Sequence, residues 1–139
     1  MRVMVFEKAS EQSEAGVLPT QELLAQMGKY NEELLKAGVM LAGEGLKASS
    51  QGARVKFEGS KRTVTDGPFP ETKELIAGFW VWKVNSMKDA IDWLKRAPFG
   101  GGVELEIRPI FEPEDFAANL TPDHRERYQR LGKQIGVKK

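Results

Sequence analysis

The sequence contains no cysteine and a single histidine among its 139 residues. Without cysteine the chain has no disulfides, no thiolate nucleophile and no ligands for iron–sulfur clusters or cysteine-bound zinc. A metal site would depend mainly on carboxylates, which favour Mg²⁺, Ca²⁺ or Mn²⁺, and no segment has the ligand spacing of such a site. We therefore expect no metal and no cofactor.

Charge of one sign and long apolar runs are also lacking. The chain has 21 Lys and Arg residues against 20 Asp and Glu residues, so no long-range field attracts a phosphate backbone and we expect no nucleic-acid partner. The glycine run at 100–102 lacks the Lys and Ser/Thr of a phosphate-binding loop. No apolar run approaches the ~20 residues that span a bilayer, and the N-terminal stretch is too short for a signal peptide. We expect a cytoplasmic protein without membrane contact.

Short segments of β-favouring residues alternate with glycine, proline and polar residues. The predicted strands are 2–6, 39–46, 77–84 and 103–110. Charged and apolar residues alternate from Arg54 to Glu58, and Gly59 and Ser60 form a tight turn into Lys61 to Thr65, which together predict a solvent-facing β-hairpin. Residues 11–18 are mostly polar and are expected to form a loop.

Two helices of the main domain have recognisable start and end signals. Thr20 is a typical N-cap, and Gly38 ends the helix that follows it. Ser86 and Asp89 resemble a capping box at the start of a second helix, which stops before Pro98. The apolar faces expected of these two helices are Leu23, Met27, Tyr30 and Leu34 in the first and Met87, Ala90, Ile91 and Leu94 in the second.

The order of these elements predicts an α+β fold of the ferredoxin-like (split βαβ) kind. It is an antiparallel sheet with two helices on one face, an extra β-hairpin and a C-terminal helix that begins at Thr121 and Pro122. We place the main domain at residues 1–112 and the helical extension at 113–139. The charged residues of 121–139 are mostly basic and those of 104–115 mostly acidic, so we expect the C-terminal helix to dock along that acidic stretch of its own or the partner subunit.

The strand at 77–84 is apolar on both faces, although two helices cover only one face of such a sheet. Phe79 and Val81 share one face, and Trp80, Trp82 and Val84 share the other. We predict that the tryptophan face is the one without helices. A second copy of the chain would then cover it, which predicts a homodimer.

The last predicted strand alternates apolar and charged residues. Its apolar face consists of Val103, Leu105 and Ile107, and its charged face of Glu104, Glu106 and Arg108. If the apolar set faces the helices, the charged set lies on the open face. There it would line a cleft for a small polar ligand together with Trp80 and Trp82. The same charges equally suit an edge strand that is protected from aggregation.

The segment from Thr63 to Glu74 is the most distinctive in the chain. Asp66 can bond backbone donors just downstream, and Phe69 can anchor the turn, although a purely structural turn has the same features. With the Asp-Gly-Pro-Phe motif at 66–69, the chain resembles the YCII-related family, in the branch named for that motif. Further segments that carry the resemblance are 37–39, 43–46, 71–74, 78–80 and 103–109. The resemblance covers most of residues 1–110 and implies a ferredoxin-like dimeric α+β barrel.

The best-known active-site suggestion for this family is a His–Asp pair near the first helix, which has no histidine here. The only histidine, His124, lies beyond the resembling region. It forms a dyad with a carboxylate if the C-terminal helix folds back, or else it is a solvated surface residue. The remaining acid/base candidates are Asp66 and Glu44, with Glu104, Glu106 and Arg108 as cleft lining.

Three functions stay open at this point. One is an enzyme that acts on a small organic substrate in a cleft on the open sheet face, with Asp66 or Glu44 as general base. Another is a binding module or regulatory partner, because the resemblance implies genes beside extracytoplasmic-function sigma factors. The third is an interaction protein without a pocket. A deep cleft that holds Asp66 with a raised pKa would favour the enzyme, and a flat apolar surface away from Asp66 would favour the partner.

Overall fold

The computed structural model describes residues 1–135, and its contacts divide the chain into two compact units. The first unit is Met1–Pro109, and the second begins at Ile110, close to the boundary expected at residue 112. Within residues 1–135, no helix is both long enough and apolar enough to cross a membrane.

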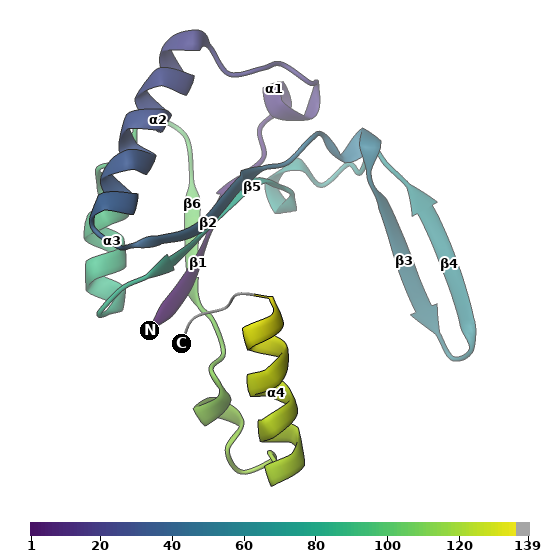
Figure 1. The fold of residues 1–139 in the computed structure, drawn as a ribbon. Coiled ribbons are helices and arrows are strands. Elements are labelled where there is room, and N and C mark those ends of the chain that lie inside the picture. Colours follow the sequence, from purple (N-terminus) through teal and green to yellow (C-terminus); the bar gives the residue numbers. More distant parts are fainter. Residues whose placement is uncertain (136–139) are drawn as a thin grey trace. The chain divides into compact units, whose positions relative to one another are not determined.

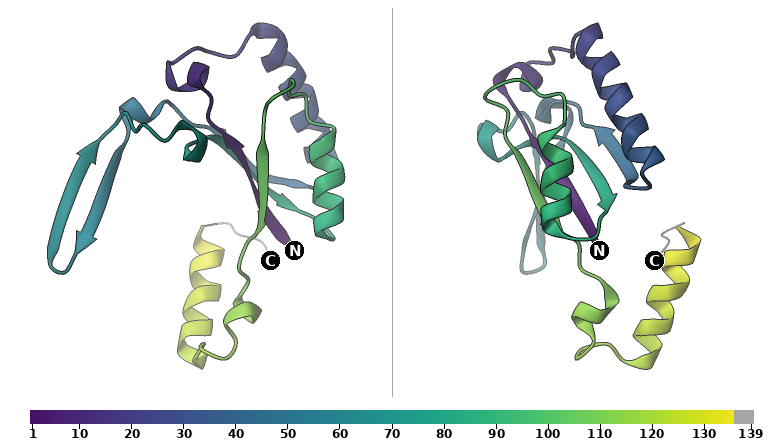
Figure 2. Two further views of the ribbon diagram at one scale, coloured as in Figure 1. Left: turned by 180° about the vertical axis from the view of Figure 1, so that it is seen from behind. Right: turned by 90° about the vertical axis from the view of Figure 1, so that its left-hand side faces the viewer.

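The first unit is built on a four-stranded antiparallel sheet in the order β2-β5-β1-β6. Its strands are β1 (Arg2–Lys8), β2 (Met40–Gly45), β5 (Ile76–Lys83) and β6 (Leu105–Pro109). Helix α2 (Gln21–Lys36) connects β1 to β2, and α3 (Met87–Lys95) connects β5 to β6. Both helices lie on one face of the sheet (Figures 1 and 2). This arrangement confirms the predicted ferredoxin-like α+β fold, whereas the dimeric barrel stays a prediction.

Helix α2 begins and ends where its local signals predict. The Thr20 hydroxyl accepts a hydrogen bond from the Leu23 N–H at 3.1 Å, which satisfies a donor that has no partner within the helix. At the other end, Gly38 has a φ of 72°, a left-handed conformation that glycine adopts without strain on a Cβ. These two residues fix the length of the helix that covers the sheet.

Helix α3 differs from its prediction in two details. The Ser86 hydroxyl accepts from the Asp89 N–H at 3.1 Å, but the Asp89 carboxylate accepts from the Asn85 N–H rather than from that of Ser86. Ile91 was expected in the core and is 40% exposed, whereas Trp93 packs against the core. The buried stripe is centred on Ala90, so Ile91, about 100° further around the helix, lies on the flank.

Residues 11–18 are not entirely a loop, because helix α1 (Glu11–Glu14) forms there. Ser10 and Ser13 cap it reciprocally: the Ser13 N–H donates to Ser10 Oγ at 3.1 Å, and the Ser10 N–H donates to Ser13 Oγ at 2.9 Å. A serine at this position replaces the glutamate of the usual capping box, so the sequence lacks the pattern that predicts a helix start.

The core lies between the sheet and the two long helices, and it contains the tryptophans. Trp82 is fully buried and Trp80 is 7% exposed. Trp82 pairs with Val3 and Trp80 with Val5, two β1 residues that are themselves fully buried. The prediction that Trp80 and Trp82 occupy the face without helices is therefore wrong. Each indole is large enough to fill the space beneath a helix, and burial there removes it from water.

The opposite face of the sheet carries the other set of residues. Phe79 pairs with Phe6 and Val81 with Met4, and all four side chains are half-buried. On the edge strand β6, Glu106 lies opposite Phe6 and Arg108 opposite Met4. Leu105 and Ile107 pack against the core instead. The expectation that the charged side chains share the face opposite the helices is confirmed for Glu106 and Arg108, whereas Glu104 precedes the strand.

The hairpin forms a separate two-stranded sheet of β3 (Ala53–Glu58) and β4 (Lys61–Asp66). Its turn is at Gly59 and Ser60, and every residue of both strands is exposed, as predicted. In Figure 1 the hairpin extends away from the four-stranded sheet. It is preceded by a short 3₁₀ helix, η1 (Ser49–Gln51), and followed by another, η2 (Thr72–Glu74).

The second unit consists of the 3₁₀ helix η3 (Pro113–Phe116) and helix α4 (Pro122–Gln134). As predicted, Thr121 caps α4, with its hydroxyl accepting from the His124 N–H at 3.2 Å and Pro122 in the first turn. The rings of Phe111 and Phe116 pack 4.7 Å apart. Docking of the basic helix on residues 104–115 stays a prediction, and residues 136–139 of that basic segment lie outside the described residues.

Candidate functional site

A cavity of about 290 Å³ lies between α2 and the sheet. Its sheet side is formed by residues of β1, β2 and β5, and its helix side by one face of α2. Pro19 and Phe99 complete the lining at its ends. Most of the cavity surface is apolar. The polar side chains that face it are the Glu7 carboxylate of β1 and the Asn31 carboxamide of α2.

The cavity exists because two core-facing positions of the sheet have no side chain. Gly78 precedes Trp80 by two residues on β5 and therefore shares its helix-covered face. It pairs with Gly45 of β2 on one side and with Glu7 of β1 on the other. A Cβ at Gly45 would meet no atom within 4 Å. The sequence thus leaves empty space under α2 where alternating apolar residues would have closed the core.

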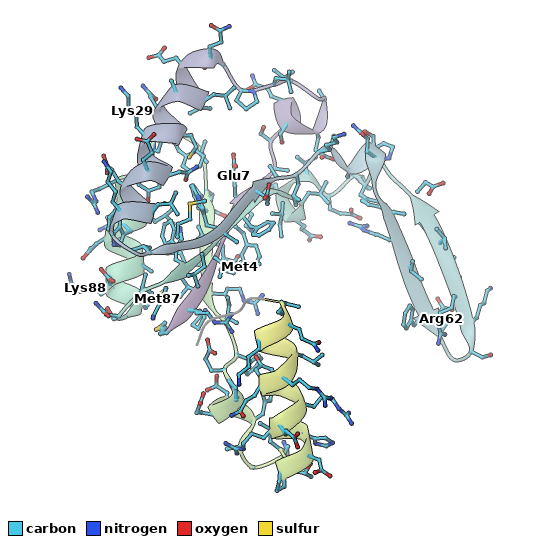
Figure 3. All side chains as sticks on the ribbon, in the orientation of Figure 1. Met4, Glu7, Lys29, Arg62, Met87 and Lys88 are labelled. Carbon is cyan, nitrogen blue, oxygen red and sulfur yellow. The ribbon has the colours of Figure 1, made fainter. Side chains whose placement is uncertain are left out.

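Glu7 points into this space. It follows Val3 and Val5 on the core-facing side of β1, and Figure 3 shows it on the α2 side of the sheet, opposite to Met4. A Cβ at Gly78 would lie 3.3 Å from Glu7 Oε2, so the carboxylate reaches across the glycine. Burial raises the pKa of the Glu7 carboxyl above the ordinary value of 4.5, because a charged group is poorly solvated in apolar surroundings.

Trp80 forms an aromatic wall of the cavity. Its ring packs edge-on against Tyr30 and Phe99, at centroid distances of 5.8 and 6.1 Å. A Cβ at Gly43 would lie only 2.7 Å from Trp80 Cδ1, so this third glycine makes room for the indole. The indole N–H donates to Asn31 Oδ1 on α2 at 3.0 Å. Trp80 is thereby held on several sides, and Asn31 is held by Trp80.

Tyr30 of α2 packs against Trp80 and helps to hold it in place. Its hydroxyl donates to the Trp93 carbonyl oxygen at 2.6 Å, which connects α2 to α3. Burial, the largest influence, raises the pKa of Tyr30 to about 12. The phenol therefore stays protonated and acts as a structural donor.

Asp66 does not line the cavity. It is the last residue of β4, its side chain is exposed, and within residues 1–135 its carboxylate takes part in no hydrogen bond. The turn that follows it is held by Ser49 instead. The Phe69 N–H donates to Ser49 Oγ at 3.0 Å, and a Cβ at Gly67 would collide with the Ser49 carbonyl oxygen. Residues 66–69 therefore form a close structural turn against η1.

Ser49 is in turn fixed by Glu14 of α1. The Glu14 carboxylate accepts hydrogen bonds from both the Ser49 N–H, at 2.9 Å, and the Ser49 hydroxyl. These hydrogen bonds lower the pKa of Glu14, since they favour its charged form. On the other side of the turn, the Arg54 guanidinium stacks on the Phe69 ring at 3.8 Å. The Phe69 ring therefore has a cation as one of its contacts.

The remaining sequence-predicted site residues are dispersed. Glu44 and Trp80 line the cavity, although Glu44 pairs with Phe79 and so directs its side chain to the opposite face of the sheet. Trp82 is core, and Glu104, Glu106 and Arg108 lie on or beside the edge strand β6, outside the cavity lining. Glu106 pairs with Lys8 at 3.5 Å, which fits the edge-strand alternative.

Sequence reasoning missed Glu7, although the sequence contains a signal for it. Glu7 is the third core-facing position of a strand whose first two are Val3 and Val5, and a carboxylate there interrupts an apolar series. His124 lies in α4 of the second unit and is exposed. Within the described part of the chain, no group of three or more His, Asp or Glu side chains is placed to hold a metal ion.

A half-buried carboxyl beside an apolar hollow is suited to proton transfer. With its pKa raised, Glu7 keeps its proton to a higher pH than an ordinary glutamate and is a stronger base once ionised. The cavity supplies the low-dielectric surroundings in which such a transfer is sensitive to nearby hydrogen bonds.

Comparisons with known proteins place the chain in a family. The solved structure of 5-chloro-2-hydroxyhydroquinone dehydrochlorinase from Burkholderia phenoliruptrix AC1100, in complex with 2,5-dihydroxybenzoquinone, is similar with a TM-score of 0.43 and 16% identity. That similarity covers 82% of this chain and 98% of the other. No curated protein sequence matches. The family model described as the YCII-related domain matches residues 1–114, and the chain therefore belongs to the YCII-related family.

Proposed function

We propose that the cavity binds a small organic molecule and that Glu7 exchanges a proton with it. The observation that carries this proposal is the position of Glu7, whose carboxyl has a raised pKa and extends into the hollow left by Gly45 and Gly78. Perturbed carboxyls in cavities are frequent at functional sites. The site is on the helix-covered side of the sheet, and Glu7 takes the role of general base that the sequence offered to Asp66 or Glu44.

The size and lining of the cavity support a ligand with a flat, apolar body. Its volume of about 290 Å³ is just below the range of ~300–1,000 Å³ for small-molecule sites, which favours a small ligand. Leu23 and Met27 line the helix side, and Trp80 and Phe99 offer aromatic surfaces. An aromatic or alicyclic compound of one ring fits these walls, with its polar group directed to Glu7.

The reaction that suits this site is proton abstraction followed by return of the proton. The Glu7 carboxylate accepts a proton from an acidic C–H or O–H group of the ligand, and the resulting carboxylic acid gives it back at the same or a neighbouring atom. The cavity is partly open, so the Glu7 carboxyl exchanges its proton with solvent between one ligand and the next.

We also propose that the YCII-related unit pairs with a second copy of itself through the face opposite the helices. Support comes from Met4, Phe6, Phe79 and Val81, which form a continuous apolar centre on that face. Burial of an apolar side chain contributes ~1.5–3 kcal/mol, so a symmetric pair of such faces supplies the association energy. The tryptophans are not needed for this pairing, since they lie in the core.

The proposed site is tested by mapping where a small probe binds. Acetophenone titrated into ¹⁵N-labelled protein should shift the amide signals of residues that line the cavity, including Asn31 and Gly45. Gly45→Val fills the hollow with an apolar side chain and should abolish those shifts. Gly28→Ala is the matched control, because Gly28 is exposed on α2 and a Cβ there also meets nothing within 4 Å. Binding that persists in Gly45→Val, or that shifts residues elsewhere, would contradict the proposal.

A further inference from the structure

The side-chain amide of Asn31 has a defined orientation. An indole N–H can only donate a hydrogen bond, so the atom of Asn31 that lies 3.0 Å from Trp80 Nε1 must be the oxygen, Oδ1. The amide nitrogen, Nδ2, is therefore the other branch of the side chain. Trp80 is itself fixed by its contacts with Tyr30 and Phe99, so it holds the amide in one orientation.

Among the residues that the structure describes, the two N–H donors of Asn31 Nδ2 have no hydrogen-bond partner. Within residues 1–135, the carboxamide makes one hydrogen bond, the one it accepts from Trp80. Asn31 is half-buried and lines the cavity from α2, whereas Glu7 lines it from β1. Asn31 and Glu7 thus line the same apolar hollow from two different elements, and Asn31 brings two N–H donors to that lining.

We infer that Asn31 is the hydrogen-bond donor of the site and selects ligands that carry a carbonyl oxygen next to an acidic C–H group. This inference rests on the proposed function, since it concerns the ligand of the same cavity. An amide N–H of Asn31 donates to the carbonyl oxygen, and Glu7 faces the adjacent carbon. The ligand class is an enolisable ketone or a ring compound with the same keto–enol group.

Glu7 and Asn31 act at the two ends of the group that enolises: Glu7 at the α-carbon and Asn31 at the carbonyl oxygen. When the Glu7 carboxylate takes the α-proton, the C–H electron pair forms the new C=C bond, and the carbonyl π electrons move to oxygen. The negative charge of the enolate then lies on the oxygen that Asn31 contacts, where a fixed N–H donor stabilises it. The Glu7 carboxylic acid returns the proton to carbon or to oxygen, which regenerates the carboxylate and yields the ketone or its enol.

A site built to donate to an oxygen should discriminate against an analogue that lacks one. Acetophenone and α-methylstyrene are a matched pair of probes, because they differ by C=O against C=CH₂ at nearly the same shape. Asn31→Asp keeps an oxygen for the Trp80 N–H and removes both donors. Asn31→Ala removes the donors without adding charge. Glu32→Gln is the control, since Glu32 is an exposed neighbour on α2 outside the cavity lining.

The test measures the affinity of both probes for the full chain and its variants. Wild type and Glu32→Gln should prefer acetophenone, and in both Asn31 variants that preference should fall about 3- to 10-fold, the value of one hydrogen bond. A preference that is unchanged in both variants, or a loss that is equal for the two probes, would overturn the role of Asn31 and leave the cavity as a binding site. If neither probe binds wild type, the proposed function is overturned together with this inference.

Discussion

Glu7 of β1 lies directly opposite Gly78 of β5, and its carboxylate extends across the space where a side chain at position 78 would be. The glycine allows a carboxyl to occupy a core-facing position without displacing the neighbouring strands. On its other side Glu7 pairs with Leu105 of β6, and no ion pair with its carboxyl is found among residues 1–135. Fold and candidate site therefore depend on the same pair of residues.

Replacing Glu7 with glutamine should stabilise the protein at neutral pH. Burial raises the folded-state pKa of Glu7 above 4.5, so ionisation favours the unfolded chain. The stability that the protonated Glu7 carboxyl gives the folded state is fully present below pH 4.5. It is lost as the pH rises through the raised folded-state pKa. Glu7→Gln should thus unfold at higher denaturant concentration than wild type at neutral pH and at the same concentration in acid. Chemical denaturation across the pH range measures this difference.

Glu32→Gln serves as the control for that series, because it removes a carboxylate from an exposed position on α2. Its effect on the free energy of unfolding should be small throughout. A Glu7→Gln effect that does not vary with pH would show that Glu7 titrates as an ordinary surface glutamate.

The two paired glycines of the cavity should differ in their tolerance of alanine. A Cβ at Gly78 would lie 3.1 Å from the Glu44 carbonyl oxygen and 3.3 Å from Glu7 Oε2, whereas a Cβ at Gly45 would have free space. Gly78→Ala should lower the free energy of unfolding by ~1–3 kcal/mol, as overpacking does. Gly45→Ala should be close to neutral. Equal losses for the two variants in thermal unfolding would argue against the hollow beside Gly45.

The Asp-Gly-Pro-Phe turn should depend on Ser49 more than on Asp66. Ser49→Ala removes the acceptor of the Phe69 N–H and the hydroxyl that donates to Glu14, and should cost about 1 kcal/mol. Asp66→Ala removes an exposed carboxylate and should change stability by less than ~0.5 kcal/mol. Neither variant should alter acetophenone affinity. Loss of that affinity in Asp66→Ala alone would restore Asp66 as a site residue.

Substitutions on the two faces of β5 should separate self-association from folding. Val81→Glu places a charge on the face opposite the helices and should give a folded monomer, whereas Trp82→Glu places it in the core and should prevent folding. Sedimentation measures self-association, and wild type should sediment at twice the mass of one chain. Circular dichroism of both variants measures folding. A wild-type protein that sediments as a stable monomer would refute the pairing.

Local signals were sufficient to predict most elements of the fold. Thr20, Gly38 and Ser86 each act through hydrogen bonds or backbone angles within a few residues, so their roles can be recognised without tertiary structure. The hairpin turn at Gly59 and Ser60 is of the same kind. The order of these elements then leaves few possible topologies, of which the ferredoxin-like sheet is one.

The faces of β5 and the site required information from distant residues. Both faces of β5 are apolar, so alternation alone could not decide between Trp80 and Phe79 as the core-facing residue. Pairing with the buried Val5 decides it. The cavity likewise arises from glycines on β5 and β2 that become neighbours of Glu7 only when the sheet forms. The distinctive motif at 66–69 therefore predicted a site at Asp66, whereas the candidate site residue is Glu7, whose strand has no unusual motif.

The most direct test of the central claim is the uptake of solvent deuterium into acetophenone at its methyl group. Proton exchange by Glu7 predicts that wild-type protein in D₂O accelerates this uptake above the buffer rate and that Glu7→Gln, which still presents an intact cavity, does not. Glu32→Gln should behave as wild type. Equal rates for wild type and Glu7→Gln, with acetophenone bound to both, would contradict the assignment of Glu7 as the group that exchanges the proton.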